Sequence, residues 1–162
     1  TLTTGAFKAL LGGFVGLTIA VTISKSIPNI IVATLVVALS TNMMNLFDLR
    51  PGRAIKVYTL LAIIIFIASA KFQREVMMLI LPAVLAYFYF DLRALTMMGD
   101  AGSNVLGVSL GVFIVSSFGL AVQVVCLILL VLIHILTEKF SLTKIIENNK
   151  FLNYLDRLGR GL

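Results

Sequence analysis

Asn42, Asn45 and Asp48 follow one another at a spacing of three residues in a largely apolar chain. Residues spaced in this way lie on one face of a helix, so they would form a polar stripe near the end of an apolar helix. Two amides and a carboxylate can hydrogen-bond a nucleotide base or sugar. Because polar groups are disfavoured at membrane depth, the stripe predicts a functional site.

A cationic cluster follows the stripe directly and contains Arg50, Arg53 and Lys56, with a helix break expected near Pro51. Residues 42–54, which hold the stripe and the two arginines, form the first polar string. Guanidinium groups bind phosphate through paired hydrogen bonds. We therefore expect Arg50 and Arg53 to contact the phosphates of a nucleotide diphosphate. The alternative is a purely topological role, because membrane helices ordinarily carry basic residues at their cytoplasmic ends.

A second acidic string, MGDAGSNVLG, places Asp100 directly after Gly99, with Ser103 at the start of the next apolar stretch. A carboxylate in a small-residue turn at a helix N-terminus can coordinate Mg²⁺ while backbone amides meet phosphate oxygens. We expect Asp100 to be a magnesium ligand, and Gly99 and Ser103 to line the phosphate site.

The elements around these strings have the composition of an integral membrane protein. Of the 162 residues, 60% are apolar and 12% are charged, and the mean hydropathy is +1.09. Such values lie outside the range of soluble domains. Apolar stretches bounded by charge and turn residues predict an all-α, polytopic transmembrane helical bundle of about six spans, some shorter than the ~20 residues that cross a bilayer. The stretches are Ala9 to Ile23, Asn29 to Met44, Ala54 to Ala70, Val76 to Phe90, Asn104 to Phe118 and Leu120 to Leu136.

The remaining residues mix charge with apolar side chains at helical spacing. We predict a transmembrane helical domain over residues 1–136, with both strings on cytoplasmic loops, and a C-terminal amphipathic cytoplasmic segment over residues 137–162. An interfacial anchor is the simplest interpretation of this segment as a whole.

The formal net charge of +6 is explained by membrane topology and requires no nucleic-acid partner. With six spans, ten of the thirteen Lys and Arg residues share the side that carries the two strings. By the positive-inside rule this side faces the cytoplasm. We expect a multi-pass protein of the cell inner (plasma) membrane, in contact with membrane lipids. The ten residues are Lys8, Arg50, Arg53, Lys56, Arg93, Lys139, Lys144, Lys150, Arg157 and Arg160.

Together the two strings resemble a known motif pair. NMMNLFD, with Gly52 shortly after it, and MGDAGSNVLG some fifty residues later are similar to the cytoplasmic signatures of the polyprenyl-phosphate N-acetylhexosamine-1-phosphate transferases. That family includes phospho-N-acetylmuramoyl-pentapeptide transferase and its UDP-GlcNAc-using relatives. The resemblance implies that Asp100 binds Mg²⁺ and that Asn45 and Asp48 line the nucleotide site, with Asn42 less directly matched.

The resemblance also implies a reaction. An N-acetylhexosamine 1-phosphate would pass from a UDP-N-acetylhexosamine to undecaprenyl or another polyprenyl phosphate, releasing UMP, with Mg²⁺ as cofactor and Asp48 and Asp100 as catalytic residues. Such a transferase would serve cell wall biogenesis in a bacterial inner membrane. The alternative is a catalytically silent homologue that acts as a membrane scaffold or binding subunit. A homodimer or a partner chain stays open.

Three features depart from the family's pattern. No Asp or Glu precedes Asp48, so the family's upstream acidic pair is not represented. Pro51 stands where a second Asp is usual, and Asn148 and Asn149 stand where a His pair is expected. The single histidine, His134, lies within the last apolar stretch. Relative to the family, these features predict an incomplete catalytic set and little transfer by this chain alone.

The missing histidines suggest how the C-terminal segment would contribute. Neutral amides form hydrogen bonds but do not neutralise charge. We therefore expect Lys144, with Arg50 and Arg53, to supply the cationic contacts to substrate, and Asn148 and Asn149 to orient it. An anchor that binds anionic lipid remains the alternative.

Overall fold

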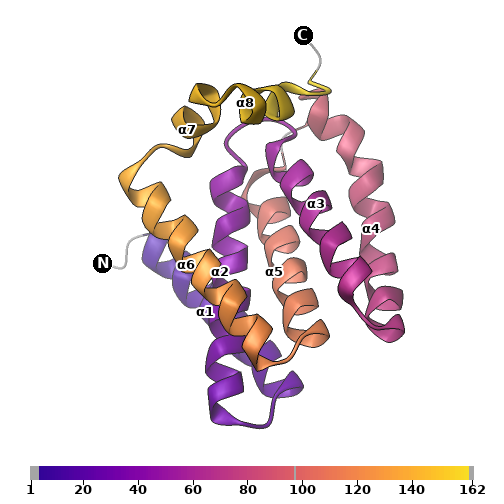
Figure 1. Ribbon diagram of the computed structural model, residues 1–162, viewed down its shortest axis with the longest axis vertical. Helices are drawn as coiled ribbons and strands as arrows, with labels where there is room; N and C mark the ends of the chain where they lie inside the picture. The colour runs from indigo at the N-terminus through magenta and orange to yellow at the C-terminus, as the bar shows by residue number, and fades with distance from the viewer. Residues whose placement is uncertain (1–3, 97, 161–162) are drawn as a thin grey trace.

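The computed structural model describes residues 4–96 and 98–160, and these residues are helical almost throughout (Figure 1). The prediction of an all-α bundle is confirmed. Helices α1 to α6 run alternately up and down, and α7 and α8 lie across one end of them (Figure 1). The helices are α1 (Thr4–Ile23), α2 (Ile27–Phe47), α3 (Arg53–Ala68), α4 (Lys71–Leu92), α5 (Gly99–Ser117), α6 (Leu120–Lys139), α7 (Leu142–Asn148) and α8 (Lys150–Arg157).

Four of the described helices are long and apolar enough to cross a membrane, so the prediction of six spans is wrong in number. The first and third predicted stretches do form helices, but the described apolar part of α1 is Gly12–Ile23, and α3 has only 16 residues. At ~1.5 Å per residue, a helix like α3 reaches roughly 24 Å, short of the ~30 Å hydrocarbon layer. The four segments make this a multi-pass membrane protein: Ile27–Phe47, Gln73–Leu92, Gly99–Ser117 and Leu120–Lys139.

Helices α2 and α5 pack closely against each other in opposite directions. Gly107 and Gly111 of α5 face the α2 backbone at Thr41 and Val37, and a Cβ added to Gly111 would lie 2.7 Å from the Cα of Val37. Glycines allow two membrane helices to approach this closely because no side chain separates the backbones.

This contact sets the register that brings the two polar strings together. One helical turn beyond Thr41 and Gly107, Asn45 and Ser103 face each other and their side chains are hydrogen-bonded. About one turn further along, α2 ends and α5 begins. The glycine interface therefore positions the site residues.

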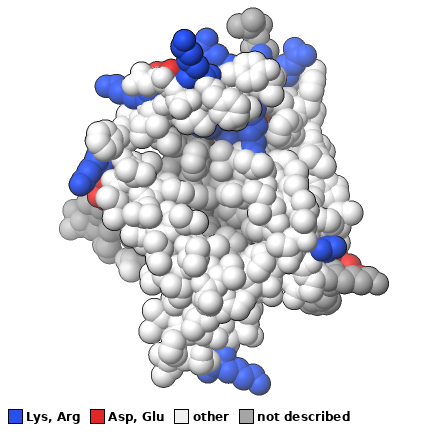
Figure 2. Space-filling model, in the orientation of Figure 1, with Lys and Arg blue, Asp and Glu red and all other residues white. Residues whose placement is uncertain are grey.

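Basic side chains gather at the end of the bundle that α7 and α8 cover (Figure 2). Lys25, between α1 and α2, and Arg74, near the start of α4, lie at the opposite end (Figure 1). The side chains of Lys8 and Lys71 lie outside the described residues. The charge asymmetry predicted from six spans persists with four, because the loops that carry the strings still share one end of the bundle.

Candidate functional site

The two predicted catalytic carboxylates meet where α2 ends and α5 begins. Asp48 is the C-cap of α2, and its backbone N–H donates to the Met44 carbonyl at 3.1 Å. The Asp48 carboxylate lies near the backbone N–H of Gly99, which favours its ionised form. Gly99 has a φ of 61°, a left-handed conformation that glycine adopts without strain. Asp100 follows it in the first turn of α5 and is exposed.

The surroundings of Asp48 disfavour its charge. Burial is the main cause that raises the pKa of the Asp48 carboxyl from 3.8 to about 6; the negative charges of Asp91 and Asp100 add to the rise, and the nearby backbone N–H of Gly99 opposes it. Carboxylates that repel one another in this way favour a bound proton or a bound cation. The site is therefore electrostatically prepared for a positive charge.

Asp91 is a member of this acidic group that the sequence alone did not single out. It lies at the end of α4, is 2% exposed, and its Oδ2 accepts a hydrogen bond from the Gly52 N–H at 3.2 Å. The available signal was its position: an ionisable residue directly after the apolar stretch Val76 to Phe90, which is a functional candidate at membrane depth.

The predicted polar stripe on α2 divides into two parts. Asn45 faces α5, where its Nδ2 donates to Asn104 Oδ1 at 2.6 Å and its Oδ1 accepts from the buried Ser103 hydroxyl. Asn42 is exposed and does not share these contacts. The amide of Asn45 therefore joins the two strings, and nucleotide contact by Asn42 stays a prediction.

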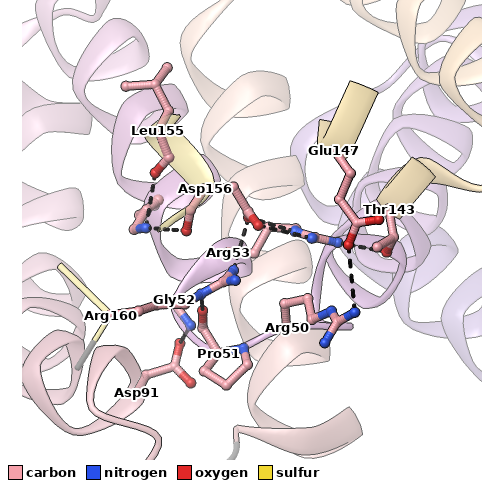
Figure 3. Close-up of polar contacts among 11 residues, drawn as sticks. Arg50, Pro51, Gly52, Arg53, Asp91, Thr143, Glu147, Leu155, Asp156 and Arg160 are labelled. Atoms are coloured by element: carbon pink, nitrogen blue, oxygen red, sulfur yellow. Dashed lines mark hydrogen bonds and ion pairs between the residues drawn. The ribbon is translucent and has the colours of Figure 1, made fainter. Parts of the chain in front are cut away.

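Arg53 binds protein groups in the described structure (Figure 3). Its guanidinium is 3% exposed and forms two hydrogen bonds with Asp156, at 2.7 and 3.1 Å. A phosphate contact by Arg53 would require these bonds to be exchanged. Arg50 is about half exposed and forms only a loose ion pair with Glu147, at 3.6 Å. Such exposed pairs are weak, so Arg50 remains available to a ligand.

The three residues of the C-terminal segment that are predicted to contact substrate lie in different environments. The side-chain oxygen of Asn149 caps the start of α8 by accepting from the N–H groups of Phe151 and Leu152, at 3.0 and 3.1 Å. Asn148 and Lys144 are exposed. Since a capping residue stabilises its own helix, Asn149 has a structural role in addition to any substrate contact.

An apolar groove of about 480 Å³ opens on the side of the bundle between α3, α4 and α5. Ala101 and Gly102, which directly follow Asp100, form part of its wall. The groove therefore reaches the start of α5. Its lining is Ile55, Ile80, Ala83, Val84, Tyr87, Met98, Ala101, Gly102, Val105 and Leu106.

The donor set suits a hard divalent cation shared with a ligand. Within residues 4–96 and 98–160, no group of three or more His, Cys, Asp or Glu could hold a metal alone. Mg²⁺ is usually held by one or two carboxylates together with substrate phosphates and water. Asp48 and Asp100 fit such an ion, since both offer oxygen ligands and each raises the negative potential at the other.

Comparison with known families bears directly on this arrangement. The family described as glycosyl transferase family 4 matches residues 2–118, a range that contains both polar strings. The chain belongs to glycosyl transferase family 4. This is a family of polyprenyl-phosphate sugar-1-phosphate transferases, so the family resemblance drawn from the two strings is confirmed. No curated protein and no solved structure matches the chain significantly. Helices α7 and α8 lie beyond the matched residues of this family 4 chain.

Proposed function

We infer that this family 4 protein transfers an N-acetylhexosamine 1-phosphate from a UDP-sugar to a polyprenyl phosphate at the cytoplasmic membrane face. The observation that carries the proposal is the pair of hydrogen bonds that Asn45 forms with Asn104 and Ser103, because they hold the two strings together beside Asp48 and Asp100. Family membership supplies the substrate classes. The panel of UDP-sugars in the experiment below identifies the sugar.

In the proposed reaction, a phosphate oxygen of the polyprenyl phosphate attacks the β-phosphorus of the UDP-sugar. A new P–O bond forms, the bond from that phosphorus to the bridging oxygen breaks, and UMP leaves with the oxygen and its electron pair. Asp48 and Asp100 would hold Mg²⁺, which when bound would neutralise charge on the pyrophosphate. Positioning and charge stabilisation account for most of the catalysis of such transfers.

The protein's own groups would hold the nucleotide around these carboxylates. The start of α5, where Gly99 and Ser103 are predicted to line the phosphate site, would offer the backbone N–H groups of its first turn to phosphate oxygens. Arg50 is exposed close by and would pair with the leaving UMP. Asn42 and Lys144 are also exposed and would contact the base, the sugar or a phosphate.

The groove between α3, α4 and α5 supports a lipid acceptor. Its wall is almost wholly apolar, as an isoprenoid chain requires, and it includes Ala101, which follows Asp100 in the chain. A polyprenyl chain lying there would bring its phosphate to the acidic site without leaving the hydrocarbon layer. Holding two reactants in this way replaces an encounter between free molecules with a single oriented step.

A silent homologue that binds the UDP-sugar without transferring its phosphate is the second candidate. It is favoured by the state of Arg53 and Lys56, two members of the cationic cluster after the polar stripe, because both contact α8. With these groups engaged, less positive charge is available to the leaving phosphate. Binding would then be retained while UMP release is absent.

The test is UMP release in proteoliposomes that contain undecaprenyl phosphate, Mg²⁺ and a panel of UDP-N-acetylhexosamines. We expect slow UMP release by the unaltered chain, at least tenfold above Asp100→Asn. Glu75→Gln, an exposed carboxylate change near the opposite end of the bundle, should match the unaltered chain. UDP-sugar binding without any UMP release would instead establish the silent homologue.

The acceptor groove has its own matched pair of variants on α4. Ala83 lines the groove, whereas Ala86 is exposed on the same helix and does not line it. Ala83→Trp should raise the polyprenyl phosphate concentration needed for half-maximal UMP release severalfold and leave UDP-sugar affinity unchanged. Ala86→Trp should change neither. Equal effects of the two substitutions would argue against the groove as the acceptor site.

A further inference from the structure

Helices α7 and α8 are fixed to the first polar string through buried charge (Figure 3). The Asp156 carboxylate on α8 accepts from Nε and Nη2 of Arg53, and the side chains of the two residues are 8% and 3% exposed. Nη1 of Arg53 donates to Thr143 Oγ1 on α7 at 3.1 Å. One guanidinium at the start of α3 therefore binds both terminal helices.

Two further cations strengthen the same contact. The Lys56 ammonium donates to the carbonyls of Leu155 and Asp156 at 3.0 and 2.8 Å, near the C-terminal end of α8, where the helix dipole favours positive charge. Arg160 donates from Nε to the Pro51 carbonyl at 2.7 Å and from Nη2 to Asp156 at 2.9 Å. Asp156 is thus shared by two arginines.

The loop between Asp48 and Arg53 is consequently held from two sides. On one side, Arg160 binds the Pro51 carbonyl. On the other, the Asp91 carboxylate of α4 accepts from the Gly52 N–H at 3.2 Å. Gly52 has a φ of 75°, and a Cβ there would clash with the side chain of Leu92, so the loop follows α4 closely.

The electrostatics of Asp156 show that the contact favours the ionised carboxylate. Burial alone would raise its pKa, but the hydrogen bonds and charges of Arg53 and Arg160 outweigh burial and hold the pKa below its ordinary value of 3.8. A buried carboxylate of this kind is strongly destabilising when its cationic partners are removed. Buried Arg53 is likewise destabilising when Asp156 is removed.

We propose that α7 and α8 form a clamp on the loop that carries Asp48, and that Asp156 is its positioning residue. Asp156 acts on the loop through Arg53 and through Arg160, which binds the Pro51 carbonyl. We assign Asp156 no contact with substrate. The two helices of the clamp lie beyond residues 2–118, which match family 4. Its consequence for nucleotide binding rests on the proposed function of the Asp48 site.

The structural test needs no ligand. Asp156→Asn removes the charge that two arginines share, and should speed amide hydrogen exchange at residues 49–56 by at least tenfold, while exchange in the α2–α5 interface stays unchanged. Asp156→Glu should restore much of the protection. Glu147→Gln is the matched control, because it removes one carboxylate from the same segment but breaks only the exposed pair with Arg50.

The functional test measures the affinity of the same variants for UDP-N-acetylglucosamine with Mg²⁺. Asp156→Asn should weaken binding at least tenfold, with recovery in Asp156→Glu and no change in Glu138→Gln, which alters an exposed carboxylate on α6. Should Asp156→Asn fail to fold, Arg160→Gln removes the Pro51 contact and one of the two arginine partners of Asp156, leaves the Arg53–Asp156 pair in place, and should show the same pattern with smaller effects.

The possible failures point to different claims. Unchanged exchange at residues 49–56 in both Asp156→Asn and Arg160→Gln would overturn the clamp. Faster exchange with unchanged nucleotide affinity would overturn its positioning role. An unaltered chain that binds no UDP-sugar at all would refute the proposed function, whereas the exchange data would still decide whether the clamp exists.

Discussion

Asp48 is surrounded by groups that disfavour its negative charge, and this explains both its raised pKa and its proposed role as a cation ligand. Burial, Asp91 and Asp100 together raise its pKa to about 6, so below about pH 6 the carboxyl holds a proton when no cation is bound. A divalent cation would replace that proton and relieve the same repulsion. Ligand binding and protonation at Asp48 are therefore expected to compete near neutral pH.

The raised pKa predicts how stability depends on pH without divalent cations. Between about pH 4 and pH 6 the folded protein holds a proton on Asp48 that the unfolded chain releases, so stability falls as pH rises through this window. Asp48→Asn removes the titrating group while keeping an acceptor for the Gly99 N–H. A rise in pKa from 3.8 to about 6 corresponds to roughly 3 kcal/mol, and solvent screening of this partly exposed carboxyl reduces that figure. Above pH 6 the variant should therefore be more stable than the unaltered chain by roughly 1 kcal/mol, ~2–4 °C, and the two should converge below pH 4.

Thermal unfolding in detergent across this pH range measures the effect. Glu138→Gln, an exposed carboxylate change on α6, should show no such divergence. A stability difference that is constant from pH 4 to pH 8 would contradict the assigned titration of Asp48.

At the scale of the helices, the α2–α5 interface decides where the site forms. Gly107 and Gly111 allow the backbones to touch, and successive turns from this contact lead to Asn45 and Ser103 and then to the acidic residues. A change in helix separation at the glycines should therefore be felt at the site. Because the two glycines have no side chain, they set the separation of α2 and α5 and so position the candidate site residues.

Two alanine substitutions with opposite expected signs test this interface. Gly111→Ala places a Cβ against the Val37 backbone and should destabilise the protein by about 1–3 kcal/mol through overpacking. Gly12→Ala on α1 meets open space and should stabilise by up to ~1 kcal/mol, because alanine favours helix. Thermal unfolding of both variants gives the comparison. Equal stabilisation by the two substitutions would show that α2 and α5 do not touch there.

Sequence pattern predicted the helices and singled out two carboxylates as candidate site residues because local signals define both. Asp48 and Asp100 stand out as charges among apolar residues, and their strings are bounded by Gly and Pro. The partner of Arg53 could not be predicted in this way, since Asp156 is 103 residues away and several acidic and basic residues were equally plausible partners. Asp91 was overlooked because a charge at the end of an apolar stretch also marks an ordinary helix boundary.

For the whole molecule, hydropathy identified a membrane protein but overestimated the number of spans. An apolar stretch can be a helix without being long enough to cross, and α3 shows this with 16 residues. The side-specific charge pattern is less sensitive to that number. It depends on which loops share an end of the bundle, and the contacts between Asn45 and Asn104 and between Arg53 and Asp156 place those loops together.

The charge pattern predicts orientation in the membrane. In a Cys126→Ser background, Leu49→Cys and Asn148→Cys should react with a membrane-impermeant maleimide only from the cytoplasmic side, because both positions are exposed at the basic end. Lys25→Cys, exposed at the opposite end, should react only from outside. Labelling of intact cells and of inside-out vesicles separates the two. Reaction of Leu49→Cys in intact cells would invert the proposed topology and remove access to cytoplasmic UDP-sugars.

The most direct measurement of the central claim is a double-mutant cycle on Mg²⁺-dependent binding of UDP-N-acetylglucosamine. If Asp48 and Asp100 form one cation and nucleotide site, Asp48→Asn and Asp100→Asn should each weaken binding at least tenfold, and the double variant should be little worse than either. Chelation of Mg²⁺ should reduce the unaltered chain to the level of the variants. Unchanged affinity in Asp100→Asn, or independent and fully additive losses, would contradict a single site formed by the two strings.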